Sequence, residues 1–90
     1  MAQIIKTASA GTMESSDAYV QIAPGNGTVE IELESVVKGQ FGKEIEAVVR
    51  QVLAECGVTD AVVSVTDRGA LDCVLRARVE TAVYRGKGEV

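Results

Sequence analysis

The chain has 90 residues, a formal net charge of −4 and no histidine. Its hydrophobic content of 47% is too high for a disordered chain, and its length is that of one domain, which we expect to span residues 1–90. The absence of histidine excludes Ser-His-Asp and Cys-His nucleophilic catalysis, and the acidic balance argues against nucleic acid as a partner. Because no apolar run is long enough for a membrane span or a secretory signal, a cytoplasmic location is expected.

Three strands are predicted in the first part of the chain. The first, over about residues 5–13, is weak, and a bulge or bend is expected at Gly11. The second covers residues 17–23, where apolar and polar side chains alternate. The turn signal Pro-Gly-Asn-Gly at 24–27 then predicts a tight hairpin into a third strand over 28–34. That strand has an apolar face of Val29, Ile31 and Leu33 and a polar face of Glu30, Glu32 and Glu34.

An amphipathic helix is predicted over residues 36–56, where the apolar positions change to helical spacing. Gly39 and Gly42 weaken its first turns, which favours a start nearer residue 40. Gly57 is placed to end the helix in a left-handed conformation. The apolar stripe consists of Phe41, Ile45, Val48, Val49, Val52, Leu53 and Cys56.

A fourth strand over residues 60–66 and a second helix are predicted in the remaining chain. Asp67 is expected to cap that helix, from about Ala70 to Arg85, by accepting backbone N–H bonds. Arg76 and Glu80 stand at the i, i+4 spacing that allows an ion pair. The apolar stripe of this helix consists of Leu71, Val74, Leu75, Val79, Ala82 and Val83.

These elements predict the fold class. Every strand has one apolar and one polar face, so the sheet should be covered on one side only. We predict an α+β fold, a two-layer α/β sandwich of order β-β-β-α-β-α, with a mostly antiparallel sheet and both helices on one face. The third and fourth strands are far enough apart for a right-handed crossover through the helix. Cys56 and Cys73 are expected to be small buried hydrophobic residues, and the tail 86–90 is expected to be frayed.

The segment 11–17, Gly-Thr-Met-Glu-Ser-Ser-Asp, lies between two predicted strands. One interpretation is a polar hairpin turn in which serine and aspartate bond to nearby backbone. The other is a modification site, because a serine at an exposed loop tip beside Glu14 and Asp17 can be presented to another enzyme. Since the loop offers no base except carboxylates, activation of the hydroxyl would have to come from that modifying enzyme.

Three segments resemble one known family. Residues 11–17 are similar to the prosthetic-group segment of the citrate lyase acyl carrier proteins, the small gamma subunits of citrate lyase. Gln-Phe-Gly at 40–42 and the long stretch DRGALDCVLRAR at 67–78 also match, and the resemblance covers residues 4–85. The chain departs from the family pattern at Met13, where leucine is frequent, at Gly39 and in the C-terminal tail, and none of these changes falls on a serine.

The resemblance implies a carrier rather than a catalyst. In that family the serine directly after the glutamate, Ser15 here, carries a phosphoribosyl-dephospho-coenzyme A group through a phosphodiester. Glu14, Ser16 and Asp17 would then form the recognition loop, and Ser16 is the adjacent hydroxyl that leaves the exact position ambiguous. No catalytic residue and no metal site is implied.

The resemblance also implies a set of partners. An alpha subunit, the acyl transferase, exchanges the acetyl on the arm's thiol for citrate. A beta subunit, the citryl lyase, splits the citryl thioester to oxaloacetate and regenerates the acetyl thioester. A prosthetic-group transferase and an acetate ligase acting on the thiol complete the set, and the carrier would work within a hetero-oligomer.

Two surfaces and two rival functions stay open. Asp72, Arg76 and Arg78 could form a docking face or a solvated helix face with local ion pairs, and the glutamates of the third strand could bind a partner or discourage edge aggregation. The first rival function is a small regulatory domain that binds a ligand non-covalently, although ferredoxin-like regulators have a different element order, βαββαβ. The second is a stand-alone enzyme, which the missing histidine disfavours.

Overall fold

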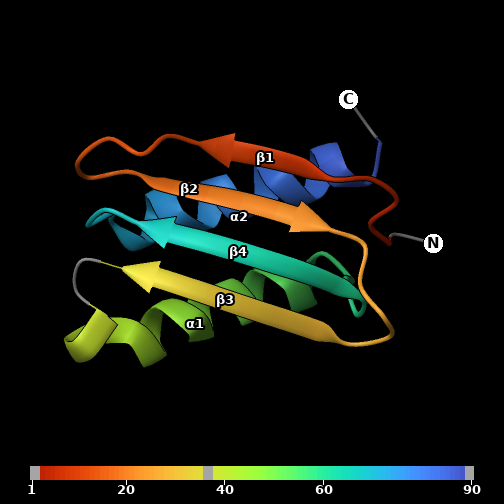
Figure 1. Cartoon of the computed structure of the whole chain (residues 1–90), viewed down its shortest axis with the longest axis horizontal. Coiled ribbons are helices and arrows are strands. Elements are labelled where there is room, and N and C mark those ends of the chain that lie inside the picture. The colour runs from red at the N-terminus through yellow and green to blue at the C-terminus, as the bar shows by residue number, and fades with distance from the viewer. Residues whose placement is uncertain (1–2, 36–37, 89–90) are drawn as a thin grey trace.

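The computed structural model describes residues 3–35 and 38–88 and forms one four-stranded sheet with two helices on one face (Figure 1). The elements follow the predicted order and the predicted two-layer fold. They are β1 (Ala8–Gly11), β2 (Ala18–Ala23), β3 (Val29–Ser35), α1 (Lys38–Glu55), β4 (Ala61–Asp67) and α2 (Asp72–Gly86). In the described part of the chain no helix is long and apolar enough to cross a membrane.

The strand order in the sheet is β1-β2-β4-β3. β1 and β2 pair antiparallel, β2 and β4 pair antiparallel, and β4 and β3 pair parallel, so the sheet is mostly antiparallel as predicted. Parallel neighbours need a long connection, and α1 supplies it between β3 and β4. The predicted crossover from the third strand through the helix to the fourth strand therefore joins two strands that lie side by side in the sheet.

The prediction of a tight hairpin at residues 24–27 is wrong. β4 lies between β2 and β3, so the connection has to cross the end of β4, which a two-residue turn cannot do. Gly27 has a φ of +98°, but Asn26 lacks the positive φ that the tight Asn-Gly turn requires. The loop is instead tied to the start of β4, where Asp60 Oδ1 accepts from the Gly27 N–H at 2.9 Å.

The core lies between the sheet and the helices. The inward side chains of β2 and β4 are almost fully buried, and those of the edge strand β3 are only half-buried. The predicted stripe of α1 is confirmed at Ile45, Val49, Val52 and Leu53, whereas Phe41 lies outside the side chains that the structure describes. Gly57 has a φ of +74° and follows α1 as expected.

The start of α2 differs from the expectation. The helix begins at Asp72, and Leu71 occupies the N-cap position without a side-chain bond. Leu71 is 71% exposed rather than part of the buried stripe, and Cys73 is exposed rather than buried. Asp67 does not cap the helix, because its Oδ1 accepts from the Ala70 N–H at 3.0 Å, before the helix starts. Its Oδ2 accepts from the Ser35 hydroxyl at 2.8 Å, which satisfies a carboxylate that is 2% exposed.

Two further expectations, the ion pair between Arg76 and Glu80 and the frayed tail, differ from the structure. Arg76 pairs with Glu55 of α1 at 2.7 Å and not with Glu80, so the ion pair joins the two helices. Residues 86–88, expected in a frayed tail, are held against the N-terminal segment. The Gly86 carbonyl accepts from the N–H of Ile5 at 2.9 Å, and the Lys87 ammonium donates to the Cys56 carbonyl at 2.7 Å.

Candidate functional site

The candidate site is the loop of residues 12–17, called the Ser15 loop below, which joins β1 to β2 at one end of the sheet (Figure 1). Pairing of the two strands ends at Gly11, which lies opposite Tyr19. Gly11 has a φ of +97°, and a Cβ at this position would collide with the Ala18 carbonyl oxygen. The bend expected at Gly11 is therefore present, and glycine is required there because the chain must leave the sheet.

The Ser15 loop is closed by its own polar groups. The Thr12 hydroxyl donates to Asp17 Oδ2 at 2.6 Å and accepts from the Glu14 N–H at 3.2 Å. The Asp17 N–H donates to the Glu14 carbonyl at 3.2 Å. Such bonds satisfy backbone groups that strand pairing can no longer serve, so they define one loop conformation.

The loop is also fixed to the body of the protein. The Ser16 N–H donates to the Arg68 carbonyl at 2.8 Å, and the Arg68 N–H donates to the Asp17 carbonyl at 2.9 Å. Arg78 of α2 donates twice to the Asp17 carboxylate, from Nε at 2.9 Å and from Nη2 at 3.0 Å. This bidentate pair joins the loop to the helix behind the sheet.

These contacts determine the charge of Asp17. The hydrogen bonds from Arg78, and after them those from the Thr12 hydroxyl and the Ala18 N–H, hold the pKa of this carboxyl well below its usual range. The same pair raises the pKa of the Arg78 guanidinium. Asp17, expected as a recognition residue, is thus the residue through which the loop is anchored to the fold.

Acid should weaken the folded state through Asp17. The pKa of Asp17 in the folded protein is below the ordinary aspartate value of about 3.9, so the stabilisation is complete above that pH and is lost as the pH falls towards the folded pKa. Asp17→Asn should therefore lower the free energy of unfolding in urea at about pH 6, and the loss should shrink at about pH 3. Glu14→Gln is the control, because the Glu14 side chain forms no hydrogen bond in the described part of the chain. A loss that is equal at both pH values would contradict this role of Asp17.

The two serines of the loop differ in their surroundings. Both are exposed, but Ser16 has a φ of +66°, a strained conformation for a non-glycine residue that its N–H bond to Arg68 maintains. Within the described residues the exposed Ser15 side chain forms no hydrogen bond. The Ser15 hydroxyl is consequently free to react without breaking a contact of the fold.

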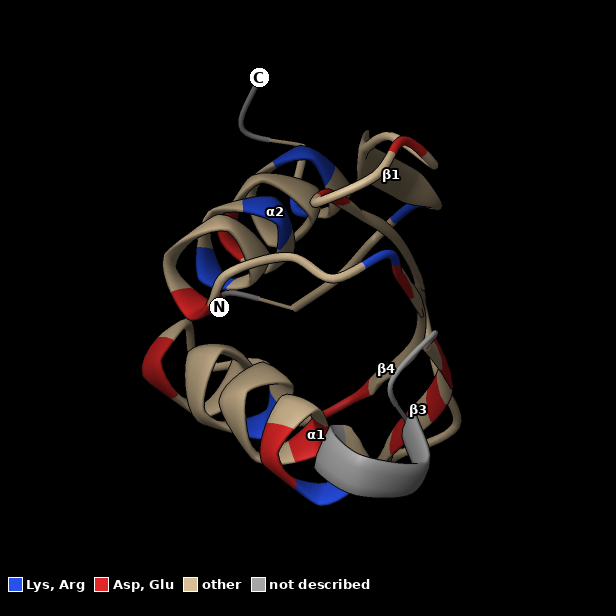
Figure 2. Cartoon of the chain, turned by 90° about the vertical axis from the view of Figure 1, so that its left-hand side faces the viewer, with Lys and Arg blue, Asp and Glu red and all other residues tan. Residues whose placement is uncertain are grey.

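The two surfaces considered for partner docking lie on α2 and on β3. Arg76 and Arg78 are both engaged in ion pairs, with Glu55 and Asp17 respectively, whereas Asp72 is exposed. The glutamates of β3 are exposed on the open face of the sheet, away from the arginines of α2 (Figure 2). In the described ranges no group of three or more acidic or cysteine side chains is arranged to hold a metal ion.

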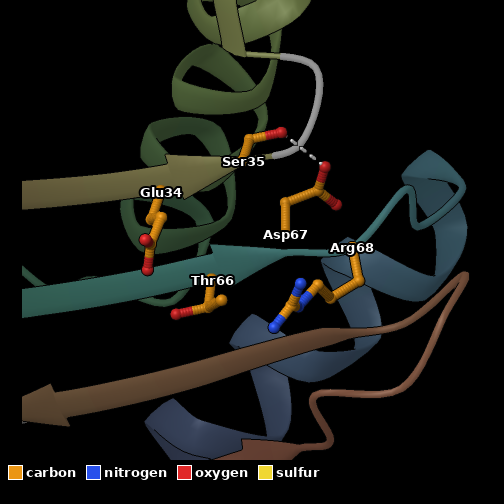
Figure 3. A pocket seen from close by; sticks show the side chains of 5 residues that line it. All are labelled: Glu34, Ser35, Thr66, Asp67 and Arg68. Carbon is orange, nitrogen blue, oxygen red and sulfur yellow. Dashed lines mark hydrogen bonds between the residues drawn. The ribbon is translucent and has the colours of Figure 1, made fainter.

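Two hollows lie at opposite ends of β3. The smaller, of about 150 Å³, is at the end nearer the Ser15 loop (Figure 3). Its lining residues are Glu34, Ser35, Thr66, Asp67 and Arg68. The larger, of about 340 Å³, is lined mostly by apolar residues between the start of β3 and the end of α1.

Sequence reasoning brought residues 14–17 together but missed three residues that shape the loop. Thr12 was inside the motif and was not singled out. Arg78 and Arg68 are 61 and 52 positions from Asp17 and Ser16, and no spacing rule links positions so far apart. Only the resemblance at residues 67–78 gave a signal, because the family motif contains both arginines.

Comparisons with known proteins agree with this architecture. A family model described as ACP: Malonate decarboxylase delta subunit (MdcD) matches residues 5–86. A chain in the crystal structure of a Pseudomonas malonate decarboxylase hetero-tetramer in complex with malonate superposes with a TM-score of 0.74. At 20% identity over 89% of this chain and 82% of that one, it supports the fold alone.

Curated relatives are much closer in sequence. Citrate lyase acyl carrier protein 2 of Salmonella paratyphi A is 56% identical over 84 residues, which cover 92% of this chain and 87% of the relative. The citrate lyase acyl carrier protein of Haemophilus influenzae is 54% identical over 87 residues, which cover 97% and 90% of the two chains. Identity of this extent, together with the shared fold, shows that the chain belongs to the family of citrate lyase acyl carrier proteins.

Proposed function

We propose that the protein is the acyl carrier subunit of a cytoplasmic citrate lyase and that Ser15 bears the prosthetic group. The observation that supports this most is the Ser15 hydroxyl itself. It is exposed at the tip of a loop whose flanks are fixed by the Asp17–Arg78 pair and by the backbone bonds to Arg68. A carrier needs such a hydroxyl on a rigid scaffold and needs no base or metal of its own.

The loop fits a phosphodiester-linked group. Phosphoribosyl-dephospho-coenzyme A would replace the proton of the Ser15 hydroxyl, which forms no hydrogen bond among the described residues. Attachment would therefore leave the bonds of Thr12 and Asp17 intact. When bound, the group supplies the thiol that carries acetyl and citryl thioesters, and the chain itself performs neither step.

Several partners would have to reach the arm in turn. We propose the alpha and beta subunits of the lyase, the transferase that installs the group and the ligase that acetylates the thiol. The net charge of −4 favours encounters with basic surfaces, and attachment to the arm raises the local concentration of the thioester at each partner site.

The intact mass of the chain purified from its host during growth on citrate tests the proposal. We expect a single species heavier by one phosphoribosyl-dephospho-coenzyme A, with the added mass mapping to a peptide that contains residues 12–17. A chain of unmodified mass from cells with active citrate lyase would overturn the carrier role. If such a chain also bound a metabolite, it would be a non-covalent ligand-binding domain instead.

A further inference from the structure

Arg68 differs from the other arginines of the protein. In the described part of the chain it is the one arginine whose guanidinium has no ion pair or hydrogen bond. The other four are paired with Glu46, Glu55 and Asp17 or with the carbonyl of Ser9; they are Arg50, Arg76, Arg78 and Arg85. An unpaired guanidinium presents a planar set of donors to an incoming anion.

The backbone places Arg68 directly beside the modification loop. Its carbonyl accepts from the Ser16 N–H and its N–H donates to the Asp17 carbonyl, so Arg68 is bonded to the two residues that follow Ser15. These bonds hold its Cα at a fixed position relative to the loop. Its side chain is exposed and takes no part in these bonds.

The side chain of Arg68 turns back along β4 towards Thr66, over the hollow of about 150 Å³ (Figure 3). Of the two carboxylates that line this hollow, Asp67 is already bonded to Ser35 and Ala70. Glu34 forms no ion pair with Arg68 in the described contacts. The hollow therefore places an unpaired guanidinium beside the Thr66 hydroxyl, and both groups can donate to phosphate oxygens. The Ser35 hydroxyl is not available for this, because it donates to Asp67.

We propose that Arg68 binds a phosphate of the group that Ser15 carries and so turns the start of the arm towards the open face of the sheet beside Thr66. The inference rests on the proposed function, since it assumes that Ser15 bears a phosphate-linked group. Arg68 is a positioning residue in this arrangement. It sets the direction in which the arm leaves the loop and takes no part in the chemistry at the thiol.

Phosphoserine placed at position 15 during translation tests the site without the transferase. Its phosphate monoester stands in for the phosphodiester, and its second pKa, ordinarily about 6, is followed by ³¹P NMR. Arg68→Gln should raise this pKa by about half a unit, the shift expected for losing one exposed ion pair. Arg68→Lys keeps the positive charge, so the phosphate pKa in this variant should stay close to its wild-type value.

Lys6→Gln is the matched control. Lys6 is another exposed cation without a side-chain partner in the described residues, but it precedes β1 and lies at the end of that strand away from the loop. Glu14, Asp17 and Glu34 also act on the phosphate, and they are the same in all variants. Equal phosphate pKa values in the wild type and Arg68→Gln, or an equal shift in Lys6→Gln, would overturn the Arg68 site.

A second measurement separates this inference from the proposed function. In protein modified by the transferase, the ³¹P resonance of the phosphodiester should shift and narrow in Arg68→Gln, because the phosphate is no longer held. If the wild type accepts no group at Ser15, the proposed function fails, and the phosphoserine titration still decides whether Arg68 binds phosphate. If the group is attached and its ³¹P resonances are identical in both proteins, the Arg68 site fails alone.

Discussion

Ser15→Ala should abolish attachment of the prosthetic group and, with it, all citrate cleavage by the reconstituted complex. The substitution removes the only atom that can form the phosphodiester at this position. It should leave the fold unchanged, because the Ser15 side chain is exposed and forms no hydrogen bond among the described residues. Peptide mass spectrometry after incubation with the transferase measures attachment, and circular dichroism checks the fold.

Ser16→Ala is the matched control for this result. The variant should still accept the group, because the Ser16 contact to Arg68 is made by its backbone N–H and survives the substitution. Its attachment should be slower than in the wild type, since the transferase has to read the geometry of the neighbouring loop. A Ser15 variant that gains the mass while the Ser16 variant does not would move the site by one residue. Gain of the mass in both variants would place the attachment outside these two serines.

Leu53→Ala should lower the free energy of unfolding by about 2–5 kcal/mol, the usual loss when a buried leucine site is emptied. Leu53 is 1% exposed and lies on the face of α1 that packs against the sheet. A domain of this size has a total stability of roughly 5–13 kcal/mol, so the variant would lose a large share of it. Urea unfolding followed by circular dichroism gives the difference.

Leu71→Ala provides the same chemical change at an exposed position. Leu71 belongs to the predicted stripe of the second helix but is 71% exposed, so its removal should change the stability by less than about 0.5 kcal/mol. A comparable loss in both variants would show that Leu71 is buried in solution. A loss below about half a kcal/mol in Leu53→Ala would mean that the buried face of α1 is misassigned.

The type and order of the elements could be predicted because each depends on neighbours along the chain. Alternation in residues 17–23 and 28–34 and helical spacing after residue 40 are local patterns, and they gave the strands and helices within a few residues. The candidate loop was also local, since Glu14, Ser15, Ser16 and Asp17 are consecutive. Its assignment to a carrier came from the family resemblance, because its residue types alone favour an ordinary polar turn.

Strand order could not be obtained in the same way. Alternation states which face of a strand is apolar but not which strand pairs with it, so β2 and β3 were joined in a hairpin although β4 lies between them. The start of α2 was also misplaced, because Asp67 has the right side chain for a helix cap but bonds to Ser35 and to the turn at Ala70. Leu71 was consequently assigned to the buried stripe of the helix, whereas Cys73 was expected to be buried only because free cysteines usually are.

Local patterns along the chain are therefore sufficient to predict the set of elements, the single covered face of the sheet and the segment that holds Ser15. The contacts that hold that segment in place become visible only in the folded chain. Arg78 and Arg68 reach the loop from α2 and from the end of β4, and these contacts depend on β2 lying beside β4. Packing brings together a charge pair 61 positions apart and backbone groups about 50 positions apart, and no local periodicity in the chain indicates contacts over such separations.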